Sequence, residues 1–185
     1  MFMAKLRGGR KTVKAKVKRK KFLGKGFEGK VFEAEVTVKK KGKERTVTLA
    51  EKKFKRTRYK EKYARQKKKH PSFRDPKKHF ATYQELKQLN QEKGLGLRLP
   101  RTVRLRKRLL RKSTLVMSKI EIARFEDFKG RDLKNFIKDT KRQVEALKNY
   151  DYGIGPDSFF PVRGKNGKIT AVIGDFGTIR KIKKK

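Results

Sequence analysis

The chain has 185 residues, and its 58 lysines and arginines against 18 aspartates and glutamates give a formal net charge of +40. A compact domain so charged repels itself and is stabilised against a polyanion, so we expect an acidic macromolecular partner. Cysteine is absent, which excludes disulfides and thiolate metal sites, and no apolar run approaches the roughly 18 residues of a membrane span. We therefore expect a soluble, cytoplasmic protein with no membrane partner.

The distribution of charge along the chain suggests how it is divided. The first 21 residues carry ten lysines and arginines and no acidic residue. Such a block cannot bury itself, so we predict a disordered basic arm over residues 1–21. One folded domain is expected over 22–180, followed by a short basic tail at 181–185.

Alternating polar and apolar residues mark the start of the predicted domain. From Phe22 to Val38 this alternation surrounds three glycines, which predicts a strand, a glycine-rich turn and a second strand. The lysine-rich residues 39–43 are typical of a hairpin loop, and Thr46–Phe54 is a third strand candidate. Residues 55–79 mix basic residues with aromatics and two prolines, and we predict part helix and part loop there.

A helix is predicted next, because apolar residues recur at three-residue spacing between Pro76 and Gly94. Residues 101–112 then alternate basic and apolar side chains, and residues 114–122 form the most apolar strand candidate. One apolar face over residues 132–150 predicts a second helix.

Two short apolar runs near the C-terminus, Phe159–Val162 and Ile169–Ile173, flank an Asn-Gly pair at 166–167. Asn-Gly between two such runs is a strong hairpin signal. The predicted order is three strands, a helix, two strands, a helix and a hairpin. This order indicates an α+β fold with a mainly antiparallel sheet.

Residues 24–31 read Gly-Lys-Gly-Phe-Glu-Gly-Lys-Val, a G-x-G-x-x-G-x-V pattern. By itself the pattern fits a flexible turn as well as a phosphate-binding loop. A dinucleotide-binding loop runs into a helix, whereas an alternating strand follows here. The strand-loop-strand arrangement resembles the glycine-rich lid of protein kinases.

Further motifs follow in the order in which protein kinases have them. Residues 49–52, Leu-Ala-Glu-Lys, resemble the kinase V-A-I-K motif, and residues 175–177 read D-F-G. Residues 115–121 resemble the fifth strand and hinge, where backbone groups meet an adenine. The chain is thus similar to the protein-kinase-like superfamily from about Phe22 to Gly177. The resemblance implies a sheet like that of a kinase N-lobe, with one or two helices and a C-terminal hairpin.

The resemblance also implies ligands and the residues that hold them. A kinase binds ATP and Mg²⁺, with the D-F-G aspartate on the metal and a helix glutamate paired to the strand lysine. Asp175 would accordingly be the Mg²⁺ ligand, and Glu85 on the predicted helix would pair with Lys52. The nucleotide-binding residues implied in this way are Gly24, Gly26, Gly29, Lys52, Glu85 and Asp175.

The catalytic loop of kinases is not preserved. Kinases place H-R-D, four residues and then Asn ahead of D-F-G, because a carboxylate must orient the attacking hydroxyl. Here Gly153 falls at the base position and Ser158 at the Asn position, although Asp151 or Asp157 would serve in a shifted loop. The sequence also ends eight residues after Gly177, so we expect no activation segment or peptide-binding lobe. We therefore predict no catalytic residue and no required cofactor.

Basic clusters lie inside the predicted domain as well. Residues 39–69 hold sixteen lysines and arginines against three acids, and residues 98–112 hold eight against none. Cations interleaved with aromatics supply phosphate contacts and rings for base stacking, which favours structured or single-stranded RNA. The RNA-binding residues predicted on this ground are Arg10, Lys11, Lys18, Arg19, Lys20, Lys55, Arg56, Arg58, Tyr59, Tyr63, Arg65, Lys67, Lys68, Arg104, Arg106 and Arg108.

Two functions remain open at the level of sequence. The first is an RNA-binding protein, similar in its basic extensions to ribosomal proteins and bound to rRNA, built on a degenerate kinase-like domain. The second is a minimal ATP-dependent serine/threonine protein kinase with an unconventional catalytic loop. Binding to an anionic membrane surface is disfavoured, because the predicted helix at 132–150 has a narrow apolar face better explained as core.

Overall fold

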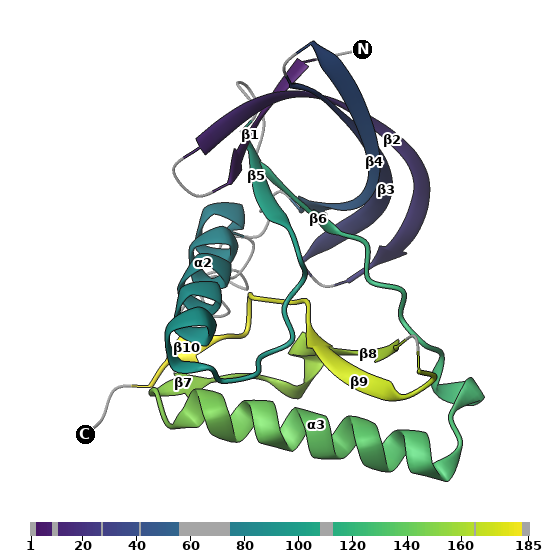
Figure 1. Cartoon of the computed structure of the whole chain (residues 1–185), viewed down its shortest axis with the longest axis vertical. Helices are drawn as coiled ribbons and strands as arrows, with labels where there is room; N and C mark the ends of the chain where they lie inside the picture. The colour runs from purple at the N-terminus through teal and green to yellow at the C-terminus, as the bar shows by residue number, and fades with distance from the viewer. Residues whose placement is uncertain are drawn as a thin grey trace.

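A closed antiparallel barrel forms one end of the molecule, and two helices with small hairpins form the other (Figure 1). The computed structural model describes residues 3–8, 11–26, 28–40, 42–55, 75–107, 113–164 and 166–182. The barrel strands are β1 (Met3–Gly8), β2 (Lys11–Lys25), β3 (Gly29–Lys40), β4 (Lys43–Phe54), β5 (Val103–Lys107) and β6 (Thr114–Ser118). They follow the order β1-β2-β3-β4-β6-β5, and β1 pairs with β5 to close the barrel.

The alternation expected from the sequence packs the interior of the barrel. Small and β-branched residues from neighbouring strands form one buried cluster, and the polar residues between them point outward. The members of this cluster are Ala15, Val17, Ala34, Val36 and Val116. A run of alternating residues therefore becomes a strand even where most of its outward residues are lysines.

The prediction of a disordered arm over residues 1–21 is wrong for most of that segment. Residues 3–8 form β1 and residues 11–21 belong to β2. Ala15 is 1% exposed and Val17 is 8% exposed, because both side chains face the barrel interior. The high density of lysine conceals a strand with period-two alternation, so charge alone does not predict disorder here.

Glu51 of β4 is a fully buried carboxylate in the barrel. It accepts hydrogen bonds from Arg19 Nε at 2.6 Å, Arg106 Nη1 at 2.9 Å and Thr114 Oγ1 at 2.6 Å. Burial would raise the pKa of Glu51, but these hydrogen bonds and the two guanidinium charges outweigh burial and lower it. The charge in the barrel is thus paired within the fold.

The other half of the molecule contains α2 (Pro76–Lys93), α3 (Gly130–Lys148), β7 (Tyr152–Gly153), β8 (Phe159–Arg163), β9 (Ile169–Ile173), β10 (Arg180–Lys181) and 3-10 turns at Phe125–Asp127 and Pro156–Ser158. Both predicted helices and the predicted β8–β9 hairpin are confirmed. Asp75 caps the start of α2 by accepting from Lys77 N, and Gly94 ends it at a φ of 59°. Fully buried side chains from both halves, among them Leu86, Leu115 and Phe176, belong to one core.

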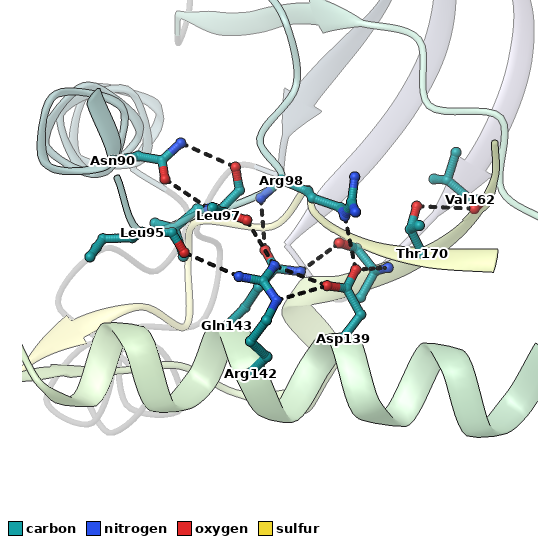
Figure 2. Close-up of polar contacts among 11 residues, drawn as sticks. Asn90, Leu95, Leu97, Arg98, Asp139, Arg142, Gln143, Val162 and Thr170 are labelled. Carbon is teal, nitrogen blue, oxygen red and sulfur yellow. Dashed lines mark hydrogen bonds and ion pairs between the residues drawn. The ribbon is translucent and has the colours of Figure 1, made fainter. Parts of the chain in front are cut away.

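Polar side chains on α3 hold the linker after α2 and strand β9 in place (Figure 2). Gln143 accepts from Arg98 N at 2.8 Å and donates to Ala171 O at 2.7 Å. Asp139 accepts from Ala171 N at 2.9 Å and from Arg98 Nε at 3.0 Å. These contacts tie the linker after α2 and strand β9 to one helix, so the residues that follow β9 start from a fixed position.

Replacing Glu51 by alanine should lower the free energy of unfolding by about 3–5 kcal/mol, because the buried Arg106 and the half-buried Arg19 would lose their carboxylate. Urea denaturation followed by circular dichroism measures the change. As a matched control, Glu33→Ala removes a carboxylate from the same sheet that pairs with the exposed Lys119, and its urea midpoint should stay nearly unchanged. Equal midpoints for the two variants would contradict the proposed role of Glu51.

Candidate functional site

A cavity of about 420 Å³ lies where the barrel meets the helical half. The turn between β2 and β3, strand β4, the end of β6 with the residues after it, strand β8 and the residues after β9 all contribute to its wall. Its apolar wall contains Val31, Ala50, Met117, Ile120 and Phe160. A concave, largely apolar surface with a few convergent charged groups is the usual form of a small-molecule site.

The glycine-rich turn covers one side of this cavity. Gly24, Gly26 and Gly29 all line it, and Gly26 N donates to Gly29 O at 2.9 Å. At Gly29 an added Cβ would lie 2.3 Å from Lys53 O, so only glycine fits against β4. At Gly24 and Gly26 an added Cβ would meet no atom within 4 Å, so the backbone there is open to a ligand.

Lys52 and Asp175, 123 residues apart in the sequence, meet at the polar end of the cavity. Lys52 Nζ lies 3.0 Å from both Asp175 carboxylate oxygens and 2.7 Å from Glu28 Oε2. Burial would lower the pKa of Lys52, but the charges of Asp175 and Glu28 raise it. The cavity therefore holds a fixed ammonium group beside the glycine-rich turn.

Sequence reasoning missed two members of this cluster, Glu28 and His79. His79 in the first turn of α2 is 1% exposed, and its Nε2 lies 3.3 Å from Glu28 Oε1. Its Nδ1 lies 3.7 Å from Asp175 Oδ1. Burial would raise the pKa of Glu28, but the His79 hydrogen bond and the Lys52 charge lower it well below its usual range. The available signal was that Glu28 is the first carboxylate in the chain and lies inside the glycine pattern.

The predicted pairing of Glu85 with Lys52 is wrong. Glu85 accepts a hydrogen bond from Tyr152 Oη at 3.1 Å, lies 3.9 Å from Lys181 Nζ, and its side chain is 52% exposed. Burial and the contact with Glu85 raise the pKa of Tyr152 to about 12. The residue of α2 beside Lys52's carboxylate partners is His79, and a separation of six residues puts Glu85 on another face of the helix.

The segment that the kinase resemblance aligns with the catalytic loop, residues 151–158, offers hydroxyl and backbone groups. Gly153 pairs with Arg180 in a short ladder, and the buried Ser158 hydroxyl hydrogen-bonds Thr178 Oγ1. Ser158 O accepts from Gly174 N at 3.0 Å, which fixes the backbone before Asp175. For a metal at Asp175, the donors close by are Glu28 and His79, whose ligand atoms and that of Asp175 all lie within 4.8 Å of one another. Asp175 thus fits as a metal ligand. Ser158, which aligns with the kinase Asn, has no carboxylate or amide group to offer a metal.

The predicted RNA-binding residues fall into three groups. Arg19 and Arg106 bind Glu51, so their predicted role in RNA binding is corrected to one inside the barrel. Lys18, Lys20 and Lys55 have exposed side chains, Lys11 lies in β2, and Arg104 is half-buried on β5. The remaining ones lie outside the described residues: Arg10, Arg56, Arg58, Tyr59, Tyr63, Arg65, Lys67, Lys68 and Arg108.

Comparison of the chain with protein-family models and with curated proteins found no match. Among the described residues, no helix is both long and apolar enough to cross a membrane. A function for this chain is therefore inferred from the geometry of the cavity and from the charge of the surface.

The lowered pKa of Glu28 predicts a dependence of stability on pH. A carboxylate whose pKa in the folded state lies below its ordinary 4.5 stabilises the fold above that pH, and the contribution is lost as the pH falls further. Glu28→Gln should lower the free energy of unfolding at pH 7 by about 1–3 kcal/mol, because buried partners lose a charged acceptor. It should also make the loss of stability below pH 4.5 shallower than in the unaltered protein.

Urea unfolding at several values between neutral and acid pH measures both effects. The exposed Glu126→Gln serves as the matched control and should follow the unaltered protein throughout. Parallel acid profiles for Glu28→Gln and the unaltered protein would rule out an ionised, buried Glu28.

Proposed function

We propose that this chain is a kinase-like domain that binds a purine nucleoside triphosphate without transferring its phosphate, and that its basic surface binds RNA such as rRNA. The observation that carries the first part is the pairing of Lys52 with Asp175 in the cavity beneath the glycine-rich turn. In this pairing a residue of the barrel meets a residue near the far end of the chain. Two motifs that occurred by chance would not be expected to meet in one cavity.

The order of the parts supports the kinase resemblance. The glycine-rich turn joins β2 to β3, Lys52 lies on the next strand of the meander, and α2 precedes β5 and β6. In protein kinases the glycine-rich loop covers the phosphates, and the strand that follows this hairpin carries the lysine. The backbone at Gly24 and Gly26 and the ammonium of Lys52 would accordingly meet the phosphates.

The other end of the cavity suits a flat, apolar base. Val31, Ala50, Met117 and Phe160 line it, and Lys119 and Ile120 follow β6 outside any strand. Apolar walls beside irregular backbone can stack a purine and offer peptide groups to its edge. This geometry favours a nucleotide over a bare phosphate as the occupant.

Phosphate transfer is not part of the proposal. Gly153 and Ser158 occupy the positions of the kinase base and the second metal ligand, and neither has a carboxylate or amide side chain. A positioned general base contributes about 10²–10⁴ to the rate. The site therefore fits binding better than catalysis.

Magnesium ATP should raise the melting temperature by about 5–10 °C when present at about 100 times its dissociation constant, because a ligand that binds only the folded state stabilises it. Lys52→Ala and Asp175→Ala should each abolish this rise. Glu85→Ala is the matched control on the surface of α2, and it should keep the rise. Differential scanning fluorimetry with the whole chain measures all four proteins.

The same thermal-shift measurement with sulfate and pyrophosphate distinguishes a nucleotide site from a general affinity for anions. A rise of the same size with these anions would contradict the nucleotide site. Transfer of labelled γ-phosphate that disappears in Asp175→Ala would contradict the absence of phosphotransfer and favour the minimal-kinase function.

A second hollow supports the RNA-binding part. It measures about 460 Å³ and lies between α2 and the start of β5 with the two residues before it. Lys87, Arg101 and Arg104 line it together with three glutamines, and its wall contains no acidic residue among those described. Cations and amides of this kind can contact phosphates and 2′-hydroxyls. We name this hollow the α2–β5 groove.

Reversing two charges at the α2–β5 groove should weaken binding to single-stranded RNA and reduce its salt dependence. Lys87→Glu with Arg101→Glu should make the slope of log K against log salt shallower by about 1.4, or about 0.7 per phosphate contact. Lys77→Glu with Lys78→Glu makes the same change of charge at exposed sites of α2 outside the groove and should have a smaller effect. Fluorescence anisotropy at several salt concentrations measures the slopes, and equal slopes for the two double variants would exclude the groove.

A further inference from the structure

We propose that Glu28, His79 and Asp175 form a binding site for a divalent cation of the Zn²⁺ or Mn²⁺ kind. The site shares Asp175 with the nucleotide site proposed above, but it needs no nucleotide and is tested without one. Its three side chains come from the glycine-rich turn, the first turn of α2 and the loop after β9. No two of them are close in sequence, and the fold alone brings them together.

One candidate ligand atom from each of the three side chains lies within 4.8 Å of the other two, and each nitrogen of His79 already has a carboxylate oxygen at close to the spacing of a metal site. Glu28 Oε1 lies 3.3 Å from His79 Nε2, and Asp175 Oδ1 lies 3.7 Å from His79 Nδ1. Two atoms bound tetrahedrally to one Zn²⁺ at about 2.0–2.2 Å are about 3.4 Å apart. Only one imidazole nitrogen would bind the ion. The carboxylate beside the other nitrogen would keep that contact through one oxygen, the usual outer contact of a metal-bound histidine, and would bind the ion through its second oxygen, which faces Lys52.

The surrounding residues hold these side chains in place. An added Cβ at Gly177 would lie 2.7 Å from both Glu28 Oε1 and His79 Cε1, so glycine is what lets these two groups approach the chain there. The Phe54 ring packs edge-on against the His79 ring with centroids 4.9 Å apart. Ligands whose orientation is fixed before binding lose little conformational entropy when the ion arrives.

The site already attracts a cation. The Lys52 ammonium lies 2.7 Å from Glu28 Oε2 and 3.0 Å from Asp175 Oδ2, between two mostly buried carboxylates. A divalent ion has twice the charge of the ammonium group, so the same two carboxylates attract it more strongly. We infer that it would take the place of the ammonium, and that Lys52 would then turn into the cavity that it lines. Metal and ammonium compete for the same two carboxylates in this arrangement.

The donor set indicates the kind of metal. Mg²⁺ prefers oxygen ligands and keeps several of its waters, whereas imidazole nitrogen suits Zn²⁺ and other transition metals. One nitrogen with two carboxylates leaves a coordination position open, as in zinc sites that keep a water or a substrate group. The D-F-G resemblance implies Mg²⁺ on Asp175, and the neighbouring His79 and Glu28 change that preference.

Isothermal titration calorimetry of the untagged, EDTA-treated chain with ZnCl₂, MnCl₂ or MgCl₂, without nucleotide, tests the site. We expect one Zn²⁺ or Mn²⁺ per chain and weaker binding of Mg²⁺. His79→Asn should lower the Zn²⁺ affinity by more than about 100-fold, since even the loss of an outer contact costs about 10–100-fold. His70→Asn, the change at the other histidine of the chain, is the matched control and should keep the affinity.

Lys52→Met supplies a test that does not depend on how well His79→Asn folds. Removing the competing ammonium should raise the Zn²⁺ affinity by at least about tenfold, because the two carboxylates lose their internal cation. Equal Zn²⁺ affinity in His79→Asn and His70→Asn would overturn the site. So would an absence of Zn²⁺ binding in both the unaltered protein and Lys52→Met. Because nucleotide is absent, either result leaves the thermal shift with ATP as a separate test.

Discussion

The arrangement of the cavity between the barrel and the helical half depends on one buried ammonium group, that of Lys52. Lys52 Nζ lies between Glu28 and Asp175, so it joins the glycine-rich turn, the middle of the barrel and the loop after β9. A cation removed from water needs such partners, and removal of either carboxylate would leave a charge poorly compensated. Apolar side chains and glycines form most of the rest of the cavity wall, together with Lys25, Ser118 and Lys119.

A second cluster of charged residues compensates the charge that is buried in the barrel. Glu51 forms ion pairs with both Arg19 and Arg106 within the fold, while exposed lysines such as Lys18 lie on the outer face of the same sheet. Closure of the sheet between β1 and β5 also pairs strands that would otherwise expose their edges. A chain with so large a positive charge can therefore fold with two arginines paired inside the barrel and lysines such as Lys18 on its outside.

Local patterns in the sequence determined most of the elements. Alternation predicted the strands at Phe22–Val38 and Thr46–Phe54, three-residue spacing predicted α2, and Asn-Gly predicted the β8–β9 hairpin. These signals act between near neighbours, so they survive without any knowledge of the fold. The strands at residues 3–8 and 11–21 were missed because their burial depends on partners in other strands, which charge density does not reveal.

For the site, the order of the motifs in the sequence identified the three glycines, Lys52 and Asp175, all of which line one cavity. The sequence also indicated the excess of positive charge and the lack of a carboxylate at Gly153. Only the tertiary structure decided that His79, and not Glu85, lies beside the cluster, and that Glu28 binds Lys52. The physical reason is that the rotation of α2 about its axis is set by its packing against the barrel and the core, and no local spacing in the sequence encodes that rotation.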